Sequence, residues 1–271
     1  MDLRSKVAVV TGGGSGIGRE LALACAKEGM RVVLADVDER GMAETGKEFV
    51  QVRCDVSKAD ELEKLAHETY KRFGAAHLLF NNAGVAVRGP AWTATLEDWK
   101  WVLDINLMGV VHGIRAFMPR MLAQGDEGHV VNTASVAGLL SLPGSAVYCV
   151  SKHGVVTLSE CLLHDLQVAK AKIGVSVLCP AFVNTGISES ERNRPAELAA
   201  TNPDAAPYTN AMKKAVAAGK MTAAEVAAIT LEAVKSKRFY VLPHQKIKQA
   251  IETRMNDVLG ERMPTDVSRP V

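Results

Sequence analysis

The sequence predicts one α/β domain built on a doubly wound parallel sheet of about seven strands flanked by helices. Short apolar, β-branched runs alternate six times with longer segments of helical character, which is the pattern of a parallel sheet. Turns marked by glycine and proline separate these runs. The 271 residues, 48% of them hydrophobic, suffice for one large core, and no linker or internal repeat divides them. We therefore expect residues 1–271 to form a single domain.

The alternation gives each element an expected place in the chain. Strands are expected at residues 6–11, 31–36, 49–56, 77–84, 128–135, 173–179 and 238–242. Helices are expected at residues 19–29, 57–73, 95–118, 146–168, 222–234 and 246–259. Ser57, Thr95 and Thr222 precede three of these helices. They should cap them, because a hydroxyl accepts a hydrogen bond from a free N–H of the first turn.

A glycine-rich turn lies between the first expected strand and the first expected helix. Residues 11–18 read Thr-Gly-Gly-Gly-Ser-Gly-Ile-Gly. Strand, glycine turn and helix in this order direct free backbone N–H groups and the positive end of a helix dipole at a phosphate. The glycine spacing differs from the common Gly-x-Gly-x-x-Gly, and an ordinary flexible loop is the alternative. We favour pyrophosphate binding, by Gly12, Gly14, Ser15, Gly16, Ile17 and Gly18.

Asp36 ends the second expected strand, 18 residues beyond the glycine turn. A carboxylate at this place can accept hydrogen bonds from the adenosine ribose and repels a 2′-phosphate, which favours NAD over NADP. No basic residue stands at Ser15 or Val37 to bind such a phosphate, although Asp36 could also be an ordinary surface acid. Asp55 and Val56 end the third strand and are expected beside the adenine.

Tyr148 and Lys152 stand four residues apart at the start of the helix expected at residues 146–168, so their side chains share one helix face. A free phenol has a pKa of about 10, and an ammonium group within about 4–6 Å favours the phenolate. The pair can therefore serve as an acid/base near neutral pH. Ser135 follows the fifth strand and offers its hydroxyl to a substrate oxygen. By itself, Tyr-x-x-x-Lys is more often an ordinary tyrosine near a surface lysine.

The polar stretch at residues 186–220 follows the carboxyl end of the sixth strand. Ligands bind at this edge of a doubly wound sheet, so we expect a substrate lid here, with an inert surface excursion as the alternative. Residues 244–271 are expected to form a C-terminal helix and tail.

Charge and composition argue against several classes of partner. The net charge is only +2 and the charges are not grouped, so neither nucleic acid nor a membrane is expected. No segment has the ~18 uninterrupted apolar residues of a membrane span, and the first residues lack a signal-like apolar stretch. Five scattered cysteines predict reduced thiols in a cytoplasmic protein. Two Cys/His pairs have helical spacing, but no further ligand converges on them, and we expect no metal site.

Several motifs occur in a fixed order along the chain. They are Thr11-Gly-x-x-x-Gly16-x-Gly18, Asn81-Asn82-Ala83-Gly84, Asn106, Ser135, Tyr148-x-x-x-Lys152 and Pro180-x-x-Val183-x-Thr185. Over about residues 5–187 the sequence thus resembles the short-chain dehydrogenase/reductase family, which has an NAD(P)-binding Rossmann fold.

The resemblance implies a role for each motif. Tyr148 is the expected general acid/base, and Ser135 is expected to hold the reacting oxygen. Lys152 is expected to bind the nicotinamide ribose and to lower the pKa of Tyr148, and Asn106 to anchor a water in a proton relay. The cofactor is expected to contact the residues of the other motifs, namely Asn82, Ala83, Gly84, Pro180, Val183 and Thr185. Ala181 stands where the family commonly has glycine, which should be a minor backbone effect.

These roles imply an NAD(H)-dependent alcohol dehydrogenase or carbonyl reductase that interconverts a secondary alcohol and a ketone. The substrate is expected to be apolar and to lie among Ser135, Tyr148, Ala137 and Phe182, although Arg88 and Trp92 could enter the pocket and change the preference.

Several alternatives remain open from the sequence. They are an NADP(H)-dependent carbonyl reductase, an enoyl reductase or epimerase, and a non-catalytic dinucleotide sensor. The complete set of four catalytic residues argues against a sensor, which needs no acid/base. A homodimer or homotetramer is expected. The C-terminus lacks the glycine-rich ending common in tetrameric family members, which makes a dimer plausible.

Overall fold

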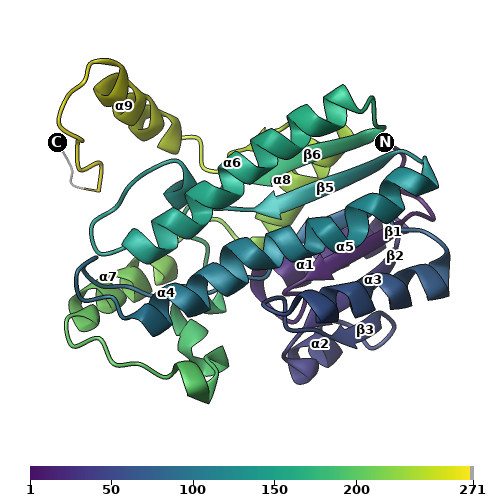
Figure 1. The fold of residues 1–271 in the computed structure, drawn as a ribbon, viewed down its shortest axis with the longest axis horizontal. Helices are drawn as coiled ribbons and strands as arrows, with labels where there is room; N and C mark the ends of the chain where they lie inside the picture. Colours follow the sequence, from purple (N-terminus) through teal and green to yellow (C-terminus); the bar gives the residue numbers. More distant parts are fainter. Residues whose placement is uncertain (269–271) are drawn as a thin grey trace.

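The structure of the protein is a computed structural model that describes residues 1–268. In these residues, seven strands form one sheet in which every neighbouring pair is parallel (Figure 1). The strands are β1 (Val7–Thr11), β2 (Arg31–Asp36), β3 (Val50–Arg53), β4 (Leu78–Asn81), β5 (Gly128–Thr133), β6 (Ile173–Leu178) and β7 (Tyr240–Val241). The predicted fold class is confirmed.

The α-helices connect these strands and flank the sheet. They are α1 (Gly16–Lys27), α2 (Glu39–Thr45), α3 (Ala59–Phe73), α4 (Leu96–Leu103), α5 (Gly109–Gln124), α6 (Ala146–Val168), α7 (Ala205–Ala217), α8 (Ala223–Lys235) and α9 (Ile247–Leu259). Shorter helical segments are η1 (Asp104–Met108), η2 (Val136–Gly138), η3 (Gly186–Asn193) and η4 (Ala196–Leu198).

The strand order β3-β2-β1-β4-β5-β6-β7 reverses direction at β1. The chain first builds outward from β1 to β3, and then returns to place β4 on the other side of β1. The connections after β1 and β4 therefore diverge to opposite faces of the sheet and leave a crevice at the carboxyl ends of these two strands. The glycine turn follows β1 and the Asn-Asn-Ala-Gly turn follows β4, so both predicted cofactor motifs lie at this crevice.

The sheet is buried on both faces, which is why its strands are continuous apolar runs. Figure 1 shows α3, α5 and α6 on one side of the sheet and α1 and α8 on the other. Along β1, Ala8 and Val10 belong to the apolar layer shared with α1 and α8, whereas Val7 and Val9 belong to the layer shared with α3 and α5. Successive residues of a strand point to opposite faces, so one short run supplies both layers.

Two of the three predicted helix caps are confirmed. Thr95 and Thr222 each accept a hydrogen bond from the third residue of their helices, whose carboxylate bonds back to the capping residue. The prediction at Ser57 is wrong, because α3 begins at Ala59 with Lys58 in the capping position. The Ser57 hydroxyl instead donates to a carboxylate oxygen of Asp55 at 2.7 Å, an acceptor stronger than a backbone group.

Other element boundaries also differ from the prediction. Helix α1 begins at Gly16, inside the glycine turn, rather than at residue 19. Helix α2 was not predicted, because its sequence is short and polar, and its cap is a bond from the Gly41 N–H to the Asp38 carboxylate at 2.9 Å. The helix expected at residues 95–118 is α4, a π-turn η1 and α5, and Asn106 lies in the π-turn.

The region predicted as a lid folds into η3, η4 and α7 between β6 and α8. Helix α9 was predicted, and in Figure 1 it stands apart from the sheet near the C-terminus. Among the residues that the structure describes, no helix has the length and apolar character needed to cross a bilayer.

Candidate active site

One pocket runs along the carboxyl edge of the sheet, from the end of β2 to the start of α6. Asp36 and Asp55 line one end, and Ser135, Tyr148 and Lys152 line the other. Residues of η3 and α7 form the outer wall, so the region predicted as a lid does lie against the site. One pocket therefore contains residues of both the predicted cofactor motifs and the predicted catalytic set.

Most of the predicted site residues line this pocket. They are Gly12, Ser15, Gly16, Ile17, Asp36, Asp55, Val56, Asn82, Ala83, Gly84, Ser135, Ala137, Tyr148, Lys152, Pro180, Phe182, Val183 and Thr185. Gly14, Gly18 and Asn106 are not among its lining residues and lie behind its wall.

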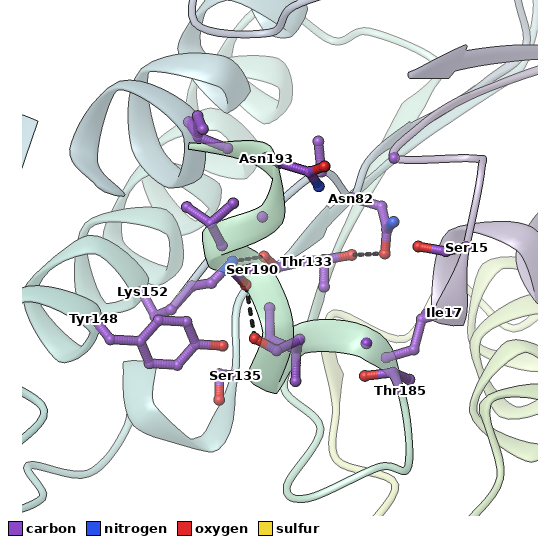
Figure 2. A pocket seen from close by; sticks show the side chains of 18 of the residues that line it. Ser15, Ile17, Asn82, Thr133, Ser135, Tyr148, Lys152, Thr185, Ser190 and Asn193 are labelled. Atoms are coloured by element: carbon purple, nitrogen blue, oxygen red, sulfur yellow. Dashed lines mark hydrogen bonds between the residues drawn. The ribbon is translucent and has the colours of Figure 1, made fainter. Parts of the chain in front are cut away.

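The glycine turn brings backbone N–H groups to the middle of the pocket. Gly12 and Gly16 have φ values of +66° and +53°, which favour glycine because it has no side chain. A Cβ on Gly18 would lie 2.0 Å from the carbonyl oxygen of Gly12, so glycine alone lets α1 start this close to β1. The first N–H groups of α1 have no partner within the helix and suit a bound pyrophosphate. Figure 2 shows Ser15 and Ile17 from this turn opposite the α6 side chains.

The Asp36 carboxylate is held by two backbone N–H groups. Its oxygens accept hydrogen bonds from Gly14 at 2.9 Å and Asp38 at 3.0 Å. Gly14 thus orients the carboxylate without lining the pocket itself. Asp38 and Asp55 line the pocket beside Asp36, which concentrates negative charge at this end. The Arg19 guanidinium donates to the carbonyl oxygen of Gly14 at 2.7 Å.

A chain of hydrogen bonds links the strand ends to Lys152. The Asn82 side chain donates to the Thr11 carbonyl at 3.1 Å and accepts from the Thr133 hydroxyl at 3.2 Å. The Lys152 ammonium in turn donates to the Thr133 carbonyl at 2.8 Å (Figure 2). A Cβ on Gly84 would lie 3.3 Å from the same ammonium nitrogen. These contacts fix Lys152 where the ends of β1, β4 and β5 meet.

Asn106 is fully buried in the π-turn between α4 and α5. Its side-chain amide donates to the Val85 carbonyl at 2.9 Å and to the Ser151 hydroxyl at 3.0 Å, and its oxygen accepts from the Val85 N–H at 2.8 Å. The side chain therefore ties the turn after β4 to α6. The water relay expected from the sequence would have to use the main chain of Asn106.

Tyr148 and Lys152 lie one turn apart on α6, as predicted, but the charges around the phenol differ from the prediction. Burial raises the pKa of Tyr148, and the opposing influences are the Arg88 charge and a hydrogen bond with Ser135. The Arg88 guanidinium carbon lies 5.1 Å from the ring centroid of Tyr148, compared with 5.8 Å for the Lys152 nitrogen. Lys152 itself is only 3% exposed, and burial lowers its pKa to about 8. Burial is therefore the largest influence on the Tyr148 pKa, and Arg88 is a second cation beside the phenol that the Tyr-x-x-x-Lys spacing does not reveal.

Ser135 is placed by the end of β5 and the loop after β6. Its hydroxyl accepts from the Ala137 N–H at 3.2 Å and donates to the Pro180 carbonyl at 3.4 Å. The same carbonyl accepts the Val136 N–H at 3.0 Å, which joins the two loops. Ser135 thus faces the pocket from a rigid junction, below Tyr148 in the view of Figure 2.

The sequence did not identify the lid residues that line the pocket. Met212 and Val216 line it from α7, and Ser190 and Asn193 line it from η3. Met212 and Val216 stand four apart, and this helical spacing was the available signal. Of the two residues that could have entered the substrate pocket, Arg88 lines it. Trp92 is 86% exposed and is not among the lining residues.

Within residues 1–268, no group of three or more His, Cys, Asp or Glu side chains could hold an ion. The ring of His153, one member of a helically spaced Cys/His pair, bonds through Nδ1 to the Cys149 carbonyl at 2.9 Å.

The chain is similar in sequence to a family of known proteins and to individual members of it. A family model described as short chain dehydrogenase matches residues 6–196. A "CLA biosynthesis dehydrogenase/reductase" of Lactiplantibacillus plantarum is 32% identical, with 97% of this chain and 96% of that protein covered.

Solved structures are similar over nearly the whole chain. A short chain dehydrogenase/reductase from Burkholderia phymatum, in complex with NAD, is 45% identical with a TM-score of 0.96, covering 100% of this chain and 99% of that one. LigO from Sphingobium sp. strain SYK-6, in its apo form, is 31% identical with a TM-score of 0.78, covering 96% and 90%.

Proposed function

The chain belongs to the short-chain dehydrogenase family and is an oxidoreductase of that family, and from this premise we propose that it interconverts a secondary alcohol and a ketone with NAD(H). Tyr148 is the general acid/base of the proposed reaction. The observation that carries the proposal is the placement of Ser135, Tyr148 and Lys152 at one end of the pocket whose middle is the glycine turn of α1.

The residues present fit a nicotinamide dinucleotide. A Cβ on Gly12 would lie 2.9 Å from the Ala83 Cα, so glycine lets the turn before α1 pack against the turn after β4, and Gly84 permits the approach of Lys152. The similar Burkholderia phymatum protein is in complex with NAD, which supports the same class of cofactor here. When bound, the nicotinamide supplies a hydride acceptor for oxidation and a hydride donor for reduction. The residues that would hold the cofactor are the predicted cofactor-binding residues that line the pocket. They lie in the glycine turn, at the end of β2, in the turns after β3, β4 and β6, and at the start of α6.

In the proposed mechanism, Tyr148 takes the proton of the alcohol oxygen in oxidation and returns it to the carbonyl oxygen in reduction. Burial of the phenol opposes formation of its anion. The positive charges of Arg88 and Lys152 favour that anion, and their effect is strong in a site of low dielectric. With a pKa of about 8, Lys152 stays mostly protonated at pH 7 and keeps this charge.

Ser135 and Asn106 complete the proposed site. In the proposal the Ser135 hydroxyl turns its hydrogen from the Pro180 carbonyl to the substrate oxygen and holds that oxygen beside the phenol. Asn106 fixes the turn after β4 through Val85 and reaches α6 through Ser151, so in the proposal it positions Lys152 and the relay water rather than contacting substrate.

We assign NAD rather than NADP because three carboxylates line the ribose end of the pocket. Asp36, Asp38 and Asp55 would repel a 2′-phosphate there. The substrate end has mostly apolar walls, which include Leu142 and Met212, and this supports a substrate with an apolar skeleton. The cytoplasmic location and the homodimer or homotetramer expected from the sequence stay predictions.

The test of the proposed function is Tyr148→Phe, which removes one hydroxyl. We expect kcat/KM to fall roughly 10²- to 10⁴-fold, because proton transfer by a placed side chain contributes about that much. The assay follows NADH absorbance with hydroxysteroids, aryl carbinols, sugar alcohols and hydroxyacyl esters.

The matched control is Tyr70→Phe, since the Tyr70 hydroxyl bonds to Gln124 at 3.0 Å and neither residue lines the pocket. This variant should change kcat/KM less than about twofold. Near-normal turnover of any accepted alcohol by Tyr148→Phe would show that the acid/base assignment is wrong.

A further inference from the structure

Arg88 reaches the substrate end of the pocket from the loop after β4. Its guanidinium carbon lies 5.1 Å from the centroid of the Tyr148 ring, and the side chain lines the pocket. It is therefore close to the place where Tyr148 and Ser135 would hold the reacting oxygen. The sequence indicated Arg88 only as a residue that could enter the pocket and change the substrate preference, and the structure places it in the lining.

The hydrogen bonds of Arg88 leave part of its guanidinium free. Nη1 donates to the Ser145 hydroxyl, and Nε donates to the Met212 sulfur at 3.0 Å. Within residues 1–268, Nη2 donates to no protein atom. Both partners are neutral, so the guanidinium is oriented by them without its charge being balanced.

Arg88 is half-buried, and a cation that has lost much of its contact with water normally has an opposite charge beside it. Arg194, the other arginine held against an aromatic ring beside this pocket, illustrates the usual case, because it forms ion pairs with Asp98 and Glu191. Arg88 forms no ion pair in the part of the chain that the structure describes. Its burial also lowers its pKa, which is the sign of a cation deprived of water.

The acidic residues that line the pocket do not supply the missing partner. Asp36, Asp38 and Asp55 belong to the opposite end, beyond the glycine turn. Asp104 also lines the pocket but is paired with Lys100 at 2.6 Å. The described residues therefore offer Arg88 no carboxylate partner, and its free edge is open to an anion bound in the pocket.

We infer that Arg88 binds a carboxylate of the substrate, so that the enzyme acts on a hydroxy acid and its keto acid with the carboxylate close to the reacting carbon. The inference rests on the proposed function, because it assumes that this pocket binds the substrate of the proposed reaction. It narrows the expected substrates to anionic alcohols and ketones. A guanidinium with a free edge matches the two oxygens of a carboxylate.

The apolar walls are consistent with this assignment. They would contact the carbon skeleton of the acid, while Arg88 is the group that fixes its orientation. A carboxylate held at Arg88 is near Tyr148, which places the carbinol carbon only a few bonds from the acid group.

The alternative is that Arg88 has only a packing role, joining the Tyr148 ring to Met212 of the lid. A packing role gives no preference for an anion, so binding can separate the two. The probes are hexanoate and hexanamide, which have nearly the same shape and carry no reacting hydroxyl. Titration calorimetry of each into the full-length protein, with and without NADH, measures affinity independently of turnover.

We expect the protein to bind hexanoate about 10- to 100-fold more tightly than hexanamide, the range for a hydrogen bond to a charged group. Arg88→Gln should abolish this preference, and Arg88→Lys should keep part of it because the charge remains but the planar fork is lost. Lys213→Gln, which removes an exposed cation next to Met212, should leave the preference unchanged.

Equal affinities for the acid and the amide in the unmodified protein would overturn the inference, and this comparison needs no variant to fold. An acid preference that survives in Arg88→Gln would also overturn it, since another cation would then be responsible. The proposed function fails separately: an acid preference together with normal turnover by Tyr148→Phe would leave Arg88 as a carboxylate site and refute the acid/base assignment.

Discussion

Replacing Asp36 with asparagine tests the cofactor preference, because it removes a charge and keeps the shape of the side chain. The Asp36 carboxylate accepts two backbone N–H groups, and it lines the pocket beside two other acids. Asparagine retains one acceptor oxygen, so the cost to the local turn should be about 1 kcal/mol. The change in cofactor affinity should therefore reflect charge more than lost structure.

The magnitude follows from Coulomb's law. A carboxylate and one phosphate charge at about 4–6 Å repel by about 1.4–4 kcal/mol for effective dielectric constants between 20 and 40. The ratio of NADPH to NADH dissociation constants should thus fall roughly 10- to 1,000-fold in Asp36→Asn. Asp38 and Asp55 remain, so the preference should relax and not invert.

The measurement is a fluorescence titration of NADH and NADPH with both proteins at one ionic strength, since salt screens such repulsion. Glu39→Gln is the control, because this exposed acid does not line the pocket and should change the ratio less than about twofold. Tighter binding of NADPH than NADH by the unmodified protein would refute the role given to Asp36. A ratio unchanged in Asp36→Asn would refute the charge argument.

Two further predictions concern stability. Arg194→Met should lower the free energy of unfolding by about 3 kcal/mol in urea titrations, because it leaves the buried carboxylate of Asp98 without its ion-pair partner. The control is Arg192→Met, at an exposed position, which should lower the free energy of unfolding by about 1 kcal/mol or less. Burial lowers the pKa of His129 to about 4, so the unfolded state binds its proton first on acidification. Stability should fall by about 1.4 kcal/mol per pH unit as the pH drops from about 6.5 towards 4, with no contribution from this group above that range. His129→Gln should flatten this part of the profile, and an unchanged slope would contradict the assignment to this histidine, whose ring bonds to Ser176.

The fold could be predicted from sequence because burial on both faces demands continuous apolar strands, and each strand is set off by glycine or proline turns. The same logic predicted most of the candidate site residues that line the pocket. The carboxyl ends of parallel strands meet at one edge, so motifs far apart in sequence, such as the turn after β1 and Ser135 after β5, had to come together. The structure places both of these beside one pocket.

The predictions that failed share one cause: side-chain contacts that the residue pattern does not show decide between competing local structures. Ser57 has the right residue type for a cap, but the neighbouring Asp55 carboxylate takes its hydroxyl. The π-turn at Asn106 depends on bonds to Val85 and Ser151, both distant in sequence. The pKa of Tyr148 likewise depends on its burial and on Arg88, neither of which the Tyr-x-x-x-Lys spacing reveals.

The distribution of charge in the pocket connects the proposals. Carboxylates gather at the end beyond the glycine turn, whereas Lys152 and Arg88 lie at the end that holds Tyr148. A dinucleotide that placed its nicotinamide beside the carboxylates would leave both cations without a function, so the polarity of the pocket favours one direction of binding. In the two proposals Arg88 both stabilises a phenolate and binds an anionic substrate, and these effects oppose each other. A carboxylate bound at Arg88 cancels a positive charge near Tyr148 and raises its pKa, so the proton-transfer step must then depend more strongly on Lys152.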